Sequence, residues 1–110
     1  MADDRPGFVR VASLSELTDP AQVVVTVGSD EVLLVRIGEH LYAIGNECSH
    51  EHVWLDDGHL HEDTCEIECP MHEGRFDLRT GAATHPPCEE PVPSYPVRLD
   101  GDDVLVAVAP

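Results

Sequence analysis

The sequence is poor in basic residues, in long apolar runs and in helical periodicity. The chain has six Lys and Arg residues and 22 Asp and Glu residues, which gives a formal net charge of −16. Such a composition argues against nucleic acid and anionic membranes as partners, because both attract Lys and Arg. The longest unbroken apolar run, Val104–Ala109, is far shorter than the roughly 18 residues of a membrane-spanning helix.

The opening stretch MADDRPGF has neither the basic nor the apolar segment of a secretory signal. We therefore expect a soluble, cytoplasmic protein. In the cytosol thiols stay reduced, and clustered cysteines bind metal more often than they form disulfides. The four cysteines are thus candidates for metal binding.

Short β-branched runs separated by turn residues occupy both ends of the chain. They are FVRVA (8–12), QVVVTV (22–27), VLLVRI (32–37), LYAI (41–44), YPVRL (95–99) and VLVAV (104–108). Asp100-Gly101, between the last two runs, is a strong hairpin signal. This spacing predicts an all-β fold, an antiparallel sandwich or small barrel. The stretch SLSELTDP predicts no more than one short helical turn before Pro20.

The middle of the chain has a different character. Residues 46–91 contain all four cysteines and six of the seven histidines. The length of 110 residues suits one domain. We predict a single domain over residues 1–110, in which about 1–45 and 85–110 form a β base and about 46–84 form a smaller, loop-rich subdomain that carries the site.

Two short Cys/His pairs lie in this middle segment. Cys48 and His50 are spaced C-x-H in NECSHEHVWL, and Cys69 and His72 are spaced C-x2-H in CEIECPMHEGRFDLRTG. Two sites fit four such ligands: a closed Cys2His2 zinc site, and a [2Fe–2S] cluster with two Cys on one iron and two His on the other. Common zinc modules pair Cys with Cys and His with His, so the mixed pairs suit the iron–sulfur site better.

The two boxes resemble those of Rieske proteins. CSH followed by CPMHEGRFDLRTG is similar to their paired C-x-H and C-P-x-H-x-G boxes, and the chain from about Phe8 to Val108 resembles the small Rieske ferredoxins of bacterial multicomponent aromatic ring-hydroxylating dioxygenases. The resemblance implies a Rieske fold whose residues 46–84 bind one [2Fe–2S] cluster. It implies that Cys48 and Cys69 hold the inner iron, while His50 and His72 hold the outer iron.

The resemblance also implies a function. We expect a monomeric electron carrier, not an enzyme, that passes single electrons from an NAD(P)H-dependent flavoprotein reductase to a terminal Rieske oxygenase. An oxygenase would need a mononuclear iron on a large second domain, for which 110 residues leave no room. Two alternatives stay open: a Rieske-like small subunit of another redox complex such as nitrite reductase, and a structural Cys2His2 zinc module.

The other cysteines and histidines are expected to be structural or solvated. The spacing of the four cysteines matches neither common ferredoxin pattern, so we expect Cys65 and Cys88 to be structural rather than ligands. His85 adjoins a proline segment that resembles the one packing over the cluster in the family. Histidines expected in solvent are His40, His52, His59 and His61, and aromatic residues expected beneath the loops are Trp54 and Phe76.

Two absences predict a low reduction potential. High-potential relatives in respiratory complexes carry an extra Cys in each box, where this chain has Val53 and Met71. Those relatives also place hydroxyl donors near the cluster, where this chain has Gly74 and Phe76. Because hydrogen bonds to the sulfurs stabilise the more negative, reduced cluster, we predict a potential near the bottom of the Rieske range, around −150 mV.

Overall fold

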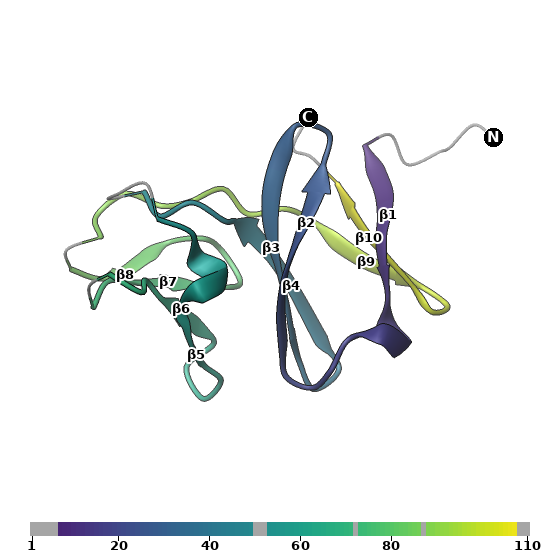
Figure 1. The fold of residues 1–110 in the computed structure, drawn as a ribbon, viewed down its shortest axis with the longest axis horizontal. Coiled ribbons are helices and arrows are strands. Elements are labelled where there is room, and N and C mark those ends of the chain that lie inside the picture. Colours follow the sequence, from purple (N-terminus) through teal and green to yellow (C-terminus); the bar gives the residue numbers. More distant parts are fainter. Residues whose placement is uncertain (1–6, 50–52, 72, 87, 108–110) are drawn as a thin grey trace.

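A three-stranded antiparallel meander forms the centre of the molecule (Figure 1). In this computed structural model, the residues described are 7–49, 53–71, 73–86 and 88–107. The meander consists of β2 (Ala21–Val27), β3 (Asp30–Ile37) and β4 (His40–Gly45). Both of its tight turns contain a glycine with positive φ, 64° at Gly28 and 63° at Gly38, a conformation that glycine adopts without steric cost.

A second antiparallel sheet brings the two ends of the described chain together. Its strands, in the order β1-β10-β9, are β1 (Phe8–Ser13), β10 (Asp103–Ala107) and β9 (Val97–Asp100). The hairpin predicted at Asp100-Gly101 joins β9 to β10, with Gly101 at φ 63°. A 3-10 turn, η1 (Leu14–Glu16), follows β1, as the single short turn predicted for this stretch.

The two sheets pack face to face, and we call them together the sandwich. Its core consists of apolar side chains that alternate along the strands, as expected for a sheet with one face inward. The buried members are Val27, Val32, Leu34, Ala43, Val104 and Val106. The predicted all-β sandwich is thereby confirmed.

A third, smaller sheet lies to one side of the meander, on the left in Figure 1. Its order is β5-β6-β7-β8, with strands β5 (His59–His61), β6 (Glu66–Glu68), β7 (Arg75–Asp77) and β8 (Ala83–His85). A second 3-10 turn, η2 (Leu55–Asp57), precedes it. Within the described residues, no helix has the length and apolar character needed to cross a membrane.

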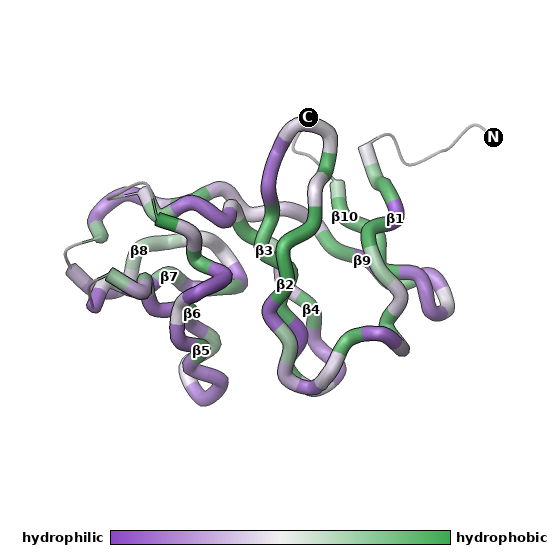
Figure 2. The backbone as a smooth tube through the Cα atoms, in the orientation of Figure 1, coloured by the Kyte–Doolittle hydropathy of each residue, from purple (hydrophilic) through white to green (hydrophobic). Residues whose placement is uncertain are grey.

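Strand β3 is buried on both faces and joins the two parts of the molecule. Val32 and Leu34 face the core of the sandwich, whereas Leu33 and Val35 face a second core beneath the third sheet. All four side chains are 0% exposed, and the middle of β3, which carries them, is green in Figure 2. Burial on both faces explains why this strand has an unbroken apolar run instead of the alternation of a half-buried strand.

Candidate metal centre

Two loops with the same backbone closure begin at Cys48 and Cys69. The Cys48 amide donates to the carbonyl of Val53 at 2.9 Å, and the Cys69 amide donates to the carbonyl of Gly74 at 2.8 Å. In each case the bond joins a cysteine to the residue five positions later. Cys48 follows β4, and Cys69 follows β6 directly. The two predicted boxes therefore start alike, each from the end of a strand.

Both cysteines lie in the same apolar core. The exposed fractions of Cys48 and Cys69 are 3% and 2%, and neither cysteine forms a disulfide. The residues that surround them come from the third sheet, from the loops and from the outward face of β3 and β4. The buried members of this core are Leu33, Val35, Ile44, Cys48, Leu55, Ile67, Cys69, Phe76, Leu78, Cys88 and Val92.

This setting fits a Rieske cluster. Two thiols in one dry core can bind an iron as thiolates, and low solvent access is one of the factors that set the potential of an iron–sulfur centre. The other two predicted ligands, His50 and His72, lie outside the described residues, as does His52. Within residues 7–49, 53–71, 73–86 and 88–107, no group of three or more Cys, His, Asp and Glu side chains is arranged to hold a metal ion.

Asn46 fixes the start of the first loop, a role that sequence reasoning missed. Its buried side chain donates to Asp56 Oδ1 at 2.9 Å and accepts from the Asp56 amide at 2.9 Å. Its carbonyl accepts from the Leu55 amide at 2.6 Å. From the sandwich, Gln22 Nε2 donates to the carbonyls of Asp56 and Gly58 at 2.8 and 3.0 Å. The signal was present, because Asn side chains commonly bond to nearby backbone in turns.

The segment after β8 returns to the first loop. Ser49 Oγ donates to the Glu90 carbonyl at 2.5 Å, and the Cys88 sulfur lies 3.8 Å from the Cys48 sulfur. The Val92 amide donates to the Gly81 carbonyl at 2.9 Å. Burial, together with the neighbouring Cys48 and Cys69, raises the pKa of the Cys88 thiol to about 12. Cys88 is 4% exposed and lies in the core, as expected.

The outer face of the third sheet carries a ladder of charged side chains. Arg75 Nη1 donates to Glu66 Oε1 at 3.1 Å, and the His61 ring lies 2.7 Å from Glu68 Oε1. Burial alone would raise the pKa of Glu66, but hydrogen bonds from Thr84, Arg75 and Thr64 outweigh it and lower that pKa. The hydrogen bond from His61 lowers the pKa of Glu68. The inner residues Ile67 and Phe76 belong to the core around the two cysteines.

Several predicted positions differ in the structure. His59 and His61 lie in β5 rather than in a turn-rich loop, and His61 is only partly exposed. Trp54 is 47% exposed, so its predicted place beneath the loops is wrong, whereas Phe76 is fully buried there. Cys65 packs against the core that contains Cys48 and Cys69, and it precedes β6 at a left-handed φ of 60°. His40 is exposed, as expected.

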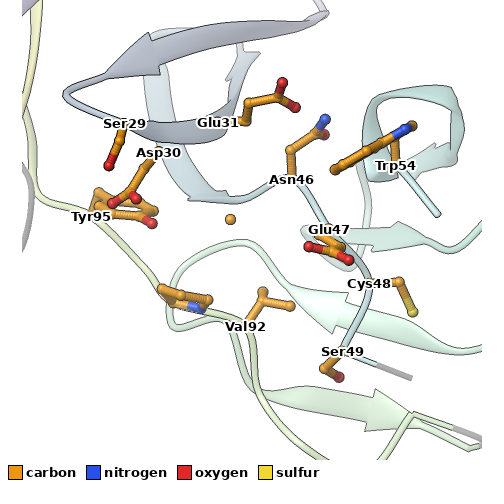
Figure 3. A pocket seen from close by; sticks show the side chains of 12 residues that line it. Ser29, Asp30, Glu31, Asn46, Glu47, Cys48, Ser49, Trp54, Val92 and Tyr95 are labelled. Carbon is orange, nitrogen blue, oxygen red and sulfur yellow. The ribbon is translucent and has the colours of Figure 1, made fainter. Parts of the chain in front are cut away.

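The surface beside the first loop combines acidic and apolar groups. A cavity of about 580 Å³ is lined by Asp30, Glu31 and Glu47, among others. Figure 3 shows Asp30 and Tyr95 at one end and Trp54, Glu47 and Cys48 at the other. Met71, in the second loop, is 66% exposed. A half-exposed Trp and acidic side chains therefore lie beside the first loop, and an exposed Met lies in the second loop.

Comparison with known proteins agrees with this site. The chain is 38% identical over 98 residues to the anthranilate 1,2-dioxygenase ferredoxin subunit of Burkholderia cepacia, with 89% of each chain covered. A solved ferredoxin of carbazole 1,9a-dioxygenase from Nocardioides aromaticivorans IC177 superposes with a TM-score of 0.90 at 49% identity, covering 93% of this chain and 98% of that one.

A second solved structure, of reduced oxygenase and oxidised ferredoxin in carbazole 1,9a-dioxygenase, contains a chain that superposes with a TM-score of 0.84. The identity is 30%, and 94% of each chain is covered. The Rieske [2Fe-2S] domain family matches residues 7–96, a span that includes both loops and the core that holds Cys48 and Cys69. The chain belongs to the Rieske [2Fe-2S] domain family.

Proposed function

We propose that this protein is the ferredoxin component of an aromatic ring-hydroxylating dioxygenase system. It carries single electrons from a flavoprotein reductase to a terminal Rieske oxygenase. The observation that carries the proposal is the pair of loops closed alike at Cys48 and Cys69, both buried in one core. The ferredoxin relatives, matched over about nine-tenths of the chain, support the same role.

The proposed ligands divide between the inner and outer irons of the cluster. Cys48 and Cys69 bind the inner iron through their thiolates, and their burial keeps water away from the sulfurs. His50 and His72 bind the outer iron through neutral imidazoles. When bound, the cluster accepts and releases one electron. Two ligand residues per loop explain why both boxes are needed and why neither Cys65 nor Cys88 is assigned.

A low potential follows from the residues around the site. Gly74 has no side chain, and the fully buried Phe76 has no hydroxyl to donate to a sulfur. No disulfide joins the two loops, and Val53 and Met71 stand where high-potential relatives carry the bridging cysteines. Fewer donors leave the reduced state less stabilised, so we propose a potential near −150 mV.

The proposed partners dock where the loops meet solvent. The net charge of −16 favours encounter with basic patches. The exposed side chains of Trp54 and Met71 provide apolar contact next to acidic groups, a composition typical of interfaces. A solved relative is found in complex with its oxygenase. We propose brief docking of a monomer in the cytoplasm, where the four thiols remain reduced.

Metal analysis with EPR of the dithionite-reduced protein tests the ligand assignment. We expect two irons and two acid-labile sulfides per chain and a rhombic Rieske signal. His50→Ala and His72→Ala should each abolish that signal, whereas Cys65→Ser should keep it. Zinc in place of iron and sulfide would support the structural Cys2His2 alternative and overturn the electron-carrier proposal.

Docking is tested by reconstituting NADH-dependent oxygen uptake with reductase and oxygenase components. Trp54→Ala should raise the ferredoxin concentration for half-maximal rate by about tenfold, because exposed Trp residues at interfaces often dominate affinity. Leu99→Ala is the matched control, since Leu99 is 42% exposed but lies on β9 of the sandwich, away from the loops in Figure 1. Equal effects of both variants would exclude Trp54 from the docking surface.

A further inference from the structure

The buried thiol of Cys88 has no role in the proposed ligand set, although it lies beside one of the ligands. Its sulfur is 3.8 Å from the Cys48 sulfur, within the range of a sulfur hydrogen bond. Cys88 is 4% exposed and Cys48 is 3% exposed, so solvent does not compete for this contact. A buried polar hydrogen without a partner is costly, and a thiol can donate to a sulfur acceptor.

The backbone holds Cys88 in this position from three sides. The Cys88 amide donates to the His85 carbonyl at 3.2 Å, at the end of β8. Two residues later, the Glu90 carbonyl accepts from Ser49 Oγ in the first loop. The Val92 amide is bonded to the Gly81 carbonyl at 2.9 Å. The segment is thereby tied both to its own sheet and to the loop that starts at Cys48.

The two sulfurs have unequal roles in the proposed site. A Cys48 thiolate bound to iron carries negative charge and is a good acceptor, whereas Cys88, which binds no metal, retains its proton. We propose that the Cys88 thiol donates a hydrogen bond to the Cys48 sulfur and thereby raises the reduction potential of the cluster. Cys88 is a positioning and tuning residue, and this inference rests on the proposed ligand role of Cys48.

The direction of the effect follows from charge. Reduction adds one negative charge that is shared with the ligand sulfurs, so a donor to the Cys48 sulfur stabilises the reduced state more than the oxidised state. The absence of hydroxyl donors at Gly74 and Phe76 gives this thiol more weight. Removal of the donor should make the protein a weaker electron acceptor.

The test compares three variants by potentiometry of the loaded protein. Cys88→Ala should lower the equilibrium constant for electron uptake by about three- to tenfold, and tenfold corresponds to 59 mV for one electron. Cys88→Ser retains a donor and should recover at least half of that loss. Val92→Ala opens a cavity in the same core without removing a donor and should change the constant less than twofold.

A second readout detects the proton directly. In the reduced protein, an exchangeable proton coupled to the cluster should be visible by ENDOR in H₂O, absent in D₂O, and missing from Cys88→Ala. An unchanged potential in Cys88→Ala overturns the proposal, and an equal drop in Cys88→Ser and Val92→Ala assigns the effect to packing. If Cys88→Ala does not fold, the ENDOR spectrum of Cys88→Ser provides the test. Loss of the exchangeable-proton signal in Cys88→Ser would overturn the proposal.

Failure of the ligand assignment has a different signature. If Cys48→Ser keeps its iron, its labile sulfide and its Rieske EPR signal, the proposed ligand set is wrong. If folded Cys88→Ala loses iron and sulfide, Cys88 is itself a ligand and the hydrogen-bond proposal fails. With iron, sulfide and EPR signal intact in Cys88→Ala, the potential alone decides whether the thiol tunes the cluster.

Discussion

We call the part of the chain from Asn46 to Val92 the loop region. The sandwich and the loop region differ in strand length and in the composition of their cores. The sandwich uses strands of four to eight residues, joined by tight turns and packed through aliphatic side chains. The four strands of the loop region have three residues each. Its core includes three cysteines among its buried residues, and its outer face is a ladder of charges.

The two parts therefore differ in what stabilises them. A sheet with long strands and an aliphatic core is stable from burial alone, whereas a small sheet of three-residue strands is marginal in water. Leu33 and Val35 of β3 pack into the core of the loop region and complete it. We therefore expect metal ligation to supply much of its remaining stability, because metal-binding energy becomes folding energy when the site forms only in the folded state.

The largest expected difference between the two parts is in their amide exchange rates after the metal is removed. In protein stripped of iron by acid and chelator, amide exchange in β5–β8 should accelerate by about 100-fold or more, whereas exchange in β2 and β10 should change less than about threefold. Hydrogen exchange read by NMR measures both at once. Uniform acceleration across all strands would show that the molecule responds as one unit and would remove the distinction.

Two neighbouring residues of β3 offer a sharper comparison. Leu33 and Leu34 are both 0% exposed, but they lie in different cores. Leu33→Ala and Leu34→Ala should each lower the free energy of unfolding by about 2–5 kcal/mol. Only Leu33→Ala should also reduce iron retention during dialysis against chelator. Val24→Ala, at a 39% exposed position of β2, is the control and should cost less than about 0.5 kcal/mol.

A pair of glycines tests the anchor of the segment that carries Cys88. Gly81 and Gly38 have φ of 81° and 63°, so alanine is strained at both. A Cβ at Gly81 would lie 2.1 Å from the Val92 carbonyl oxygen, whereas a Cβ at Gly38 meets nothing within 4 Å. Gly81→Ala should therefore destabilise the protein by about 1–3 kcal/mol more than Gly38→Ala. Urea unfolding measures the difference. Equal losses of unfolding free energy in the two variants would show that the backbone around Val92 can move away from the added Cβ at little cost.

The smallest expected effect concerns acid stability of the third sheet. Because the pKa of Glu66 is lowered in the folded state, its contribution is present above the ordinary value of 4.5 and is lost as pH falls through the lowered pKa. Glu66→Gln should cost about 1 kcal/mol at pH 7 and flatten the decline of stability below pH 4.5. Glu16→Gln, at an exposed position of η1, should leave that decline unchanged. Thermal unfolding from pH 3 to 7 makes the comparison, and identical pH profiles for both variants would contradict it.

The sequence predicts the sandwich well and the loop region in part. Six apolar runs correspond to strands because aliphatic alternation and glycine turns are local signals, as at Gly101. The short strands β5, β7 and β8 escape prediction because three polar or mixed residues carry no recognisable period. Their order comes from pairing partners distant in sequence, such as His59 with Glu68 and Arg75 with His85.

The candidate site divides in the same way. The C-x-H and C-P-x-H boxes are local patterns, so Cys48 and Cys69 are recognisable in the amino-acid sequence by themselves. The support from Gln22 depends on a contact between segments far apart in the chain, whereas the support from Asn46 comes from Asp56, ten residues later. The prediction for Trp54 is wrong because a large aromatic residue is expected in the interior, and here its neighbours Leu55 and Val53 occupy the inward positions instead.

The equal span of the two closing bonds, from Cys48 to Val53 and from Cys69 to Gly74, limits what can be altered by insertion or deletion. A residue added or removed inside either ring of six residues changes the spacing of the two bonded backbone groups and breaks the closure, whereas a change of side chain keeps that spacing. Protein engineers who wish to vary the surface presented to redox partners should therefore substitute ring residues other than the four proposed ligands, and should place extra length elsewhere. The turn between β5 and β6, which lies outside both rings, is the natural place for it.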